Sequence, residues 1–160
     1  MKIYSGNSYA TLTLTTNVGL VATVGHFYRG EPIYLENGFK VMKVEISEKY
    51  DYFIGYTNFV RSSKVAFMDL QVGDEVIIRT DKRDIRVTIT DKFQHGKTFV
   101  YKFFSGFIEE GDSGSPVIYG NDVIVGYVTY KNLFYSIYPV FEAMDKLMRR
   151  AAQGSKQPAP

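Results

Sequence analysis

The sequence contains no cysteine and only two histidines among its 160 residues. Without cysteine there is neither a disulfide framework nor a thiolate metal site, and two isolated histidines offer no metal-ligand spacing. Small secreted domains usually carry disulfides, so the lack of cysteine favours a reducing compartment. The sequence therefore predicts a protein that uses no metal and no cofactor.

Net charge and long apolar runs are also scarce. The formal net charge is +2, which is too small by itself to indicate nucleic-acid binding. No apolar run approaches the roughly 20 residues that cross a bilayer. Lys2 is followed by Ile3-Tyr4-Ser5-Gly6 rather than by the apolar stretch of a signal peptide. We therefore expect no nucleic-acid partner and no membrane segment in this chain.

Aromatic and β-branched residues are plentiful, with 13 Tyr and 12 Phe, and this composition favours strands over helices. Apolar and polar residues alternate in several short runs, most clearly over 8–15 and 85–90. Many short strands at regular spacing predict an all-β sandwich or barrel. Near the end, apolar residues at helical spacing predict an amphipathic helix over 140–153, and residues 154–160 are typical of a flexible tail.

The strongest chemical signal is Gly111-Asp112-Ser113-Gly114-Ser115-Pro116. The glycines allow a tight turn that holds the Ser113 hydroxyl out toward a substrate. The backbone N–H groups of this turn, those of Gly111, Asp112 and Ser113, form the expected binding site for a developing oxyanion. A surface turn of the same composition is the alternative.

A serine nucleophile needs a base, and the base needs an acid that orients it. His26 follows the apolar run 20–24, whereas His95 lies in the polar stretch Gln94-His95-Gly96-Lys97, which indicates a solvated loop tip. Asp51 opens the apolar run 52–56. The predicted catalytic residues are therefore His26, Asp51 and Ser113, in the chain order that is known for chymotrypsin.

These segments resemble chymotrypsin-like serine proteases, and more narrowly the small viral enzymes that process polyproteins. The nucleophile motif at 111–116, Thr23-Val24-Gly25-His26 and Asp51-Tyr52-Phe53-Ile54 carry the resemblance, supported by the cleft-lining strand 123–130. Among viral proteases the sequence resembles the astrovirus type, with arterivirus and sobemovirus enzymes as alternatives. The resemblance implies a serine endopeptidase that acts through an acyl-enzyme on a viral polyprotein. It also implies a location in the cytoplasm of the infected host cell, with any membrane association supplied by other parts of the polyprotein.

The same resemblance implies two six-stranded antiparallel β-barrels with the site at their junction. We expect an N-terminal barrel over 1–60 that carries His26 and Asp51, and a C-terminal barrel over 61–139 that carries Ser113. The helix and tail follow, and a monomer is favoured.

By the same analogy, the substrate pocket involves Phe107 and the strand segment Val128, Thr129, Tyr130 and Lys131. Phe107 holds the position where trypsin-like enzymes carry Asp, which argues against cleavage after Lys or Arg. Lys131 and Thr129 favour an acidic residue (Glu or Asp) before the cut. The alternative is that Lys131 points to solvent and the pocket takes bulky apolar residues.

Two other functions remain open from the sequence. One is a catalytically inactive binding module that keeps the protease fold. The other is an RNA-binding domain that uses Lys82, Arg83, Arg86 and Lys92, although these cations are interspersed with Asp81, Asp84 and Asp91, as on an ordinary solvated face.

Overall fold

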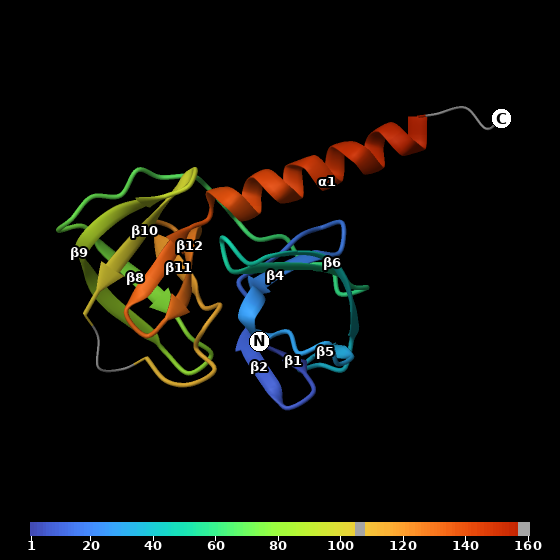
Figure 1. Cartoon of the computed structure of the whole chain (residues 1–160), viewed down its shortest axis with the longest axis horizontal. Coiled ribbons are helices and arrows are strands. Elements are labelled where there is room, and N and C mark those ends of the chain that lie inside the picture. Colours follow the sequence, from blue (N-terminus) through green and yellow to red (C-terminus); the bar gives the residue numbers. More distant parts are fainter. Residues whose placement is uncertain (105–107, 157–160) are drawn as a thin grey trace.

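The computed structural model describes residues 1–104 and 108–156. It consists of two β units side by side, with one long helix, α1 (Tyr138–Lys156), that leaves the second unit and runs along the first (Figure 1). The helix is longer than expected, since residues 154–156, which were assigned to the tail, are helical. The described residues contain no helix long and apolar enough to cross a membrane.

The first unit is a seven-stranded sheet with the order β2-β1-β5-β6-β7-β4-β3. Its strands are β1 (Lys2–Ser5), β2 (Ser8–Thr11), β3 (Leu14–Thr15), β4 (Leu20–Val24), β5 (Ile33–Leu35), β6 (Lys40–Ser47) and β7 (Tyr52–Tyr56). The sheet curls but does not close, so the prediction of a closed six-stranded N-terminal barrel was wrong.

The segment 8–15, expected to be one strand, is divided between the two edges of the sheet as β2 and β3. Its first half pairs with β1 and its second half with β4. At the end of β2, the Thr11 N–H donates to the Ser113 carbonyl at 2.8 Å, while the Leu12 and Thr13 N–H groups donate to the Met1 and Ala22 carbonyls. The segment 8–15 is therefore where the serine loop of the second unit docks on the first.

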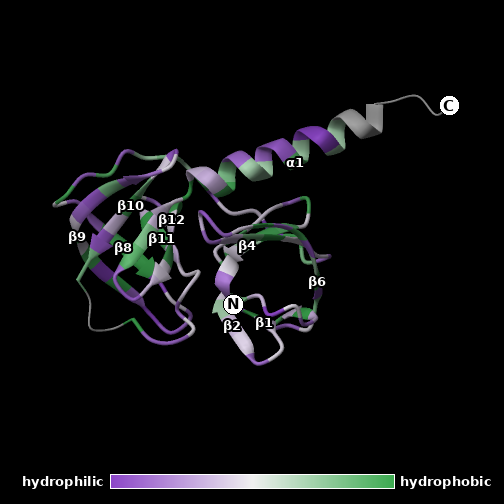
Figure 2. Ribbon diagram, viewed as in Figure 1, coloured by the Kyte–Doolittle hydropathy of each residue, from purple (hydrophilic) through white to green (hydrophobic). Residues whose placement is uncertain are grey.

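The second unit is a closed six-stranded barrel with the order β10-β13-β12-β11-β8-β9. Its strands are β8 (Glu75–Arg79), β9 (Asp84–His95), β10 (Thr98–Phe103), β11 (Pro116–Tyr119), β12 (Val123–Tyr130) and β13 (Leu133–Ser136). Along β9 the residues from Asp84 to Thr90 alternate between exposed and buried, so the apolar ones face the barrel interior. Figure 2 shows both green and purple segments along the ribbon of this barrel.

Two apolar cores hold the structure together. One fills the closed barrel around Tyr101, Phe103 and Phe134. The other lies inside the open sheet and continues across the junction to Tyr127 of β12 and Met144 of α1. Because this second core joins both units, burial of apolar surface fixes the junction at which the site lies.

Candidate active site

His26 lies in a 3-10 turn (Gly25–Phe27) directly after the buried strand β4. A side chain at residue 25 would crowd this turn, because a Cβ there would lie 3.0 Å from the Tyr52 carbonyl oxygen and 3.3 Å from Asp51 Oδ1. Gly25 thus allows the Asp51 carboxylate to approach the backbone as well as the ring of His26.

Asp51 binds His26 through both carboxylate oxygens. Oδ1 accepts a hydrogen bond from the His26 backbone N–H at 2.8 Å, and Oδ2 lies 2.7 Å from His26 Nδ1. A carboxylate can only accept, so Nδ1 carries the proton and Nε2 is left as the free basic nitrogen. Asp51 is 13% exposed and His26 is 38% exposed, so the acid lies behind the base.

The backbone at Asp51 has φ +49°, in the left-handed region. Aspartate is one of the few non-glycine residues that tolerate this conformation. The turn that precedes β7 therefore aims the carboxylate back at β4 instead of continuing the extended strand. The sequence placed Asp51 at the start of a strand and did not reveal this turn.

The serine loop is docked onto the open edge of the first unit. Gly111 has φ +89° and Gly114 has φ +92°. Thr11 Oγ1 donates to the Gly111 carbonyl at 2.8 Å, Lys2 Nζ donates to the same carbonyl at 2.9 Å, and Thr13 Oγ1 donates to the Gly114 carbonyl at 2.5 Å. Three side chains from the first unit thus fix the carbonyl groups of the loop.

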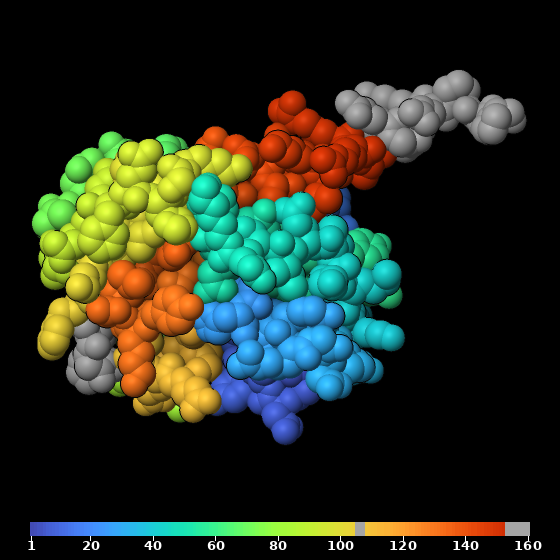
Figure 3. Space-filling model, viewed as in Figure 1, coloured from blue at the N-terminus to red at the C-terminus, as the bar shows by residue number. Residues whose placement is uncertain are grey.

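Ser113 shares one cavity of about 680 Å³ with His26. Its hydroxyl donates to the Thr129 carbonyl at 3.2 Å, and no hydrogen bond joins it to His26 in the described structure. Rotation about the Cα–Cβ bond is the motion that redirects a serine hydroxyl, and such contacts commonly tighten only when substrate binds. Figure 3 shows the site on the front face, where blue, gold and orange segments meet.

Of the three amides expected to bind an oxyanion, the Asp112 N–H donates to the Glu109 carbonyl at 3.1 Å and is thus committed to the turn. The Gly111 and Ser113 N–H groups have no acceptor within the described residues. The Asp112 carboxylate accepts from the Glu109 N–H at 2.8 Å, so it braces the loop from behind. The available donors are therefore those of Gly111 and Ser113.

The predicted substrate residues occupy different environments. Lys131 and Tyr130 line the cavity, and the Tyr130 ring stacks on His26 with centroids 5.4 Å apart. Val128 and Thr129 are fully buried, and the Thr129 hydroxyl has no hydrogen-bond partner among the described residues, so Thr129 offers the site its carbonyl group rather than its side chain. Phe107 lies outside the described residues.

Sequence reasoning missed the wall of the cavity that the first unit supplies. This wall includes Ser8, Tyr9, Arg29 and Glu31, while Glu109 and Glu110 add carboxylates from the serine loop side. No motif marks these residues. They reach the cavity because the β1–β2 hairpin and the segment before β5 fold over the serine loop.

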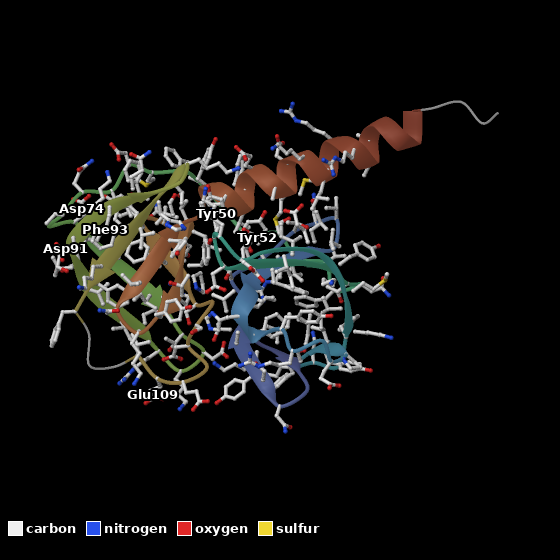
Figure 4. All side chains as sticks on the ribbon, in the orientation of Figure 1. Tyr50, Tyr52, Asp74, Asp91, Phe93 and Glu109 are labelled. Atoms are coloured by element: carbon white, nitrogen blue, oxygen red, sulfur yellow. The ribbon has the colours of Figure 1, made fainter. Side chains whose placement is uncertain are left out.

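His95 is not a solvated loop tip, and that expectation was wrong. It ends β9, its Nε2 lies 2.7 Å from the Lys49 carbonyl oxygen, and its ring meets Tyr50 and Tyr135 edge-on. Tyr50 lies at the junction of the two units below the start of α1 (Figure 4).

Three of the four suggested RNA-binding cations are paired with carboxylates. Lys82 binds Glu109 at 3.3 Å, Arg86 binds Glu75 at 2.8 Å, and Lys92 binds Asp69 at 2.6 Å. These pairs make an ordinary mixed surface. Within residues 1–104 and 108–156, no three His, Cys, Asp or Glu side chains come together as a metal site.

The fold is similar to that of solved serine proteases. The inactive form of the Rv3671c protease of M. tuberculosis matches with a TM-score of 0.67 and 17% identity, over 91% of this chain and 86% of that one. A serine endoprotease from Yersinia pestis gives 0.71 and 14%, over 92% and 62%. The HtrA-type protease AlgW, solved with a decapeptide, gives 0.70 and 12%, over 88% and 51%.

A comparison of the sequence with protein-family models and with curated proteins finds no match. At identities of 12–17% the likeness to these structures shows the fold. The chain thus has the serine-protease fold, with one closed barrel, one open sheet and a C-terminal helix.

Proposed function

We propose that this protein is a serine endopeptidase in which Ser113, His26 and Asp51 act together. One observation carries the proposal: Asp51 binds His26 through both carboxylate oxygens, and His26 lines the cavity that also holds Ser113. This contact leaves the free nitrogen of His26 as a base, and the loop offers two unused amides beside the serine.

The chemistry follows from this arrangement. Ser113 Oγ attacks the peptide carbonyl while His26 Nε2 takes its proton, which gives a tetrahedral oxyanion held by the N–H groups of Gly111 and Ser113. His26 then returns the proton to the leaving amine, and an acyl-enzyme remains. His26 then takes a proton from a water molecule that attacks the acyl carbonyl. The ester bond to Ser113 Oγ breaks, His26 returns the proton to that oxygen, and the carboxylic acid product leaves. Each amide donor contributes roughly 3 kcal/mol to such a transition state.

An active-site probe tests the proposal directly. A fluorophosphonate should label the wild-type protein, and the label should disappear in Ser113→Ala and in His26→Ala. Thr129→Val keeps the carbonyl that accepts from Ser113 and is the matched control, which should label normally. Absence of labelling in the folded wild-type protein would refute the peptidase.

The hydrogen bond from Ser113 to the Thr129 carbonyl favours a second candidate, an inactive module that keeps the fold and binds peptides without cutting them. The two candidates give opposite results with the same probe. A protein that binds a peptide in this cavity and remains unlabelled would be the inactive module.

The natural substrate that we propose is a viral polyprotein in the cytoplasm of an infected cell. The motifs around His26, Asp51 and Ser113 and the lack of cysteine support this. Expression of the chain with its flanking polyprotein, beside the Ser113→Ala form, tests it. Discrete cleavage products should form only with Ser113.

An acidic residue before the cut is the preference that we propose. It is supported by the position of Lys131 on the cavity wall, although Glu109 and Glu110 line the same cavity. A peptide library should show Glu or Asp enriched before the cut, and Lys131→Glu should abolish that enrichment. A wild-type preference for Lys or Arg would contradict it.

A further inference from the structure

The two residues that precede Asp51 belong to the first unit but are held by the second. The Lys49 carbonyl oxygen faces His95 Nε2 at 2.7 Å. The Tyr50 carbonyl accepts from the Tyr127 hydroxyl at 2.6 Å, and the Tyr50 hydroxyl accepts from the Lys97 N–H at 3.1 Å. Three consecutive polar contacts therefore cross the junction within two residues of the catalytic acid.

Tyr127 supplies the buried part of this contact. It lies on β12, has no exposed surface, and reaches across the junction with its hydroxyl. Burial is the main reason that the pKa of Tyr127 lies well above its ordinary value, with the Asp51 charge next. Its hydroxyl therefore remains a neutral donor. Without it, the Tyr50 carbonyl would lose a hydrogen bond at a site closed to water.

The hairpin between β9 and β10 supplies the other part. A carbonyl oxygen only accepts, so His95 must carry a proton on Nε2 to bind Lys49. The ring lies edge-on to Tyr50, with centroids 5.7 Å apart. Gly96 beside it has φ +58°, and a side chain there would overlap the Tyr50 hydroxyl. The β9–β10 hairpin therefore packs closely on the loop that precedes Asp51. Figure 3 shows the hairpin (yellow) in contact with this loop (teal).

These contacts lie next to the unusual backbone of Asp51. Its φ of +49° is allowed for aspartate but is not the preferred conformation. The turn itself contributes two bonds, a long one from the Asp51 N–H to the Glu48 carbonyl at 3.4 Å and one from the Tyr50 N–H to Ser47 Oγ at 3.1 Å. Forces from outside the turn are needed to hold such a conformation.

We propose that His95, Tyr127 and Tyr50 form a clamp between the two units that positions the Asp51 carboxylate against His26. These three are positioning residues, and their effect on catalysis rests on the proposed peptidase function. The clamp makes the geometry of the acid and base depend on correct docking of the two units. A poorly docked molecule therefore has a misdirected His26.

Kinetics of three variants and a control test the clamp. Tyr127→Phe and His95→Phe keep the rings and remove one donor each, and each should lower kcat on the order of tenfold to a hundredfold with KM unchanged. His95→Gln can still offer an N–H and should recover most of the activity. Tyr135→Phe is the control, since it keeps the ring against His95 and its hydroxyl makes no hydrogen bond to a described residue.

Nitrogen NMR separates positioning from a general loss of stability. The chain has two histidines, so His95→Gln assigns both rings. In the folded wild-type protein, His26 should carry its proton on Nδ1 and His95 on Nε2. In Tyr127→Phe and His95→Phe, the His26 ring should become a mixture of the two tautomers, whereas Tyr135→Phe should match the wild type.

The two measurements distinguish the possible failures. Wild-type kcat and an unchanged His26 tautomer in folded His95→Phe and Tyr127→Phe would overturn the clamp. An inactive wild-type protein would refute the peptidase, and the NMR result would still decide the clamp. If Tyr127→Phe does not fold, comparison of His95→Phe with His95→Gln decides whether the clamp exists.

Discussion

Gly114→Ala offers the most direct test of how the serine loop is held. Gly114 has φ +92°, and a Cβ at this position would overlap the Thr11 carbonyl oxygen and lie 2.5 Å from Thr23 Oγ1. Because the Thr11 atom belongs to backbone, it cannot rotate away. The loop must shift off the first unit or the edge of the sheet must open.

The size of the effect follows from two contributions. The left-handed conformation costs an alanine about 1–2 kcal/mol. Separating the loop from the sheet also removes the bond from the Thr11 N–H to the Ser113 carbonyl and the bond from Thr13 Oγ1 to the Gly114 carbonyl, at about 1 kcal/mol each. We expect a loss of roughly 3 kcal/mol in the free energy of unfolding.

Gly120→Ala is the matched control. Gly120 has φ +66° in the turn between β11 and β12, and nothing lies within 4 Å of a Cβ placed there. It shares the conformational cost without the overlap, so about 1 kcal/mol is expected. Urea unfolding of both variants gives the steric contribution as their difference.

Peptidase activity of Gly114→Ala and Gly120→Ala provides a second test. Gly114→Ala should lose at least a hundredfold in kcat/KM because Ser113 is displaced, whereas Gly120→Ala should act as the wild type. Equal stability of the two variants, with Gly114→Ala fully active, would refute the docking of the serine loop on the first unit.

Three further results are expected. Asp51→Asn tolerates the left-handed backbone, so it should stay folded by circular dichroism while kcat falls by about 10⁴-fold, and near wild-type turnover would contradict the role of the acid. Lys2→Met removes a charged donor from the Gly111 carbonyl. It should lower kcat about tenfold in a peptide-cleavage assay and leave KM unchanged. Burial opposes ionisation of Asp81, but the Met1 amino group and Lys2 outweigh it and lower its pKa. The stability that this ion pair contributes is present at neutral pH and is lost as the pH falls below about 4. In Asp81→Asn, the melting temperature should therefore change less with pH in this acid range. A melting temperature that falls with acid as in the wild type would exclude the ion pair.

The sequence by itself indicated the β content, and it supplied the candidate residues for the proposed chemistry. In alternating runs such as 85–90, apolar residues recur at every second position. Only in a strand do such residues all lie on the same face, where they can be buried together. A serine between two glycines, a histidine after a buried strand and an aspartate before another are local patterns. They can be identified without knowing which strands are neighbours.

Tertiary structure alone decided how these residues meet. The segment 8–15 has the pattern of one strand, but its halves join opposite edges of the sheet, and Thr11 also binds the serine loop of the other unit. His95 has the sequence context of an exposed turn, yet it is placed against Lys49 and Tyr50 by the docking of one unit on the other. Contacts between residues far apart in the chain depend on packing across the whole junction, and no short stretch of sequence encodes that packing.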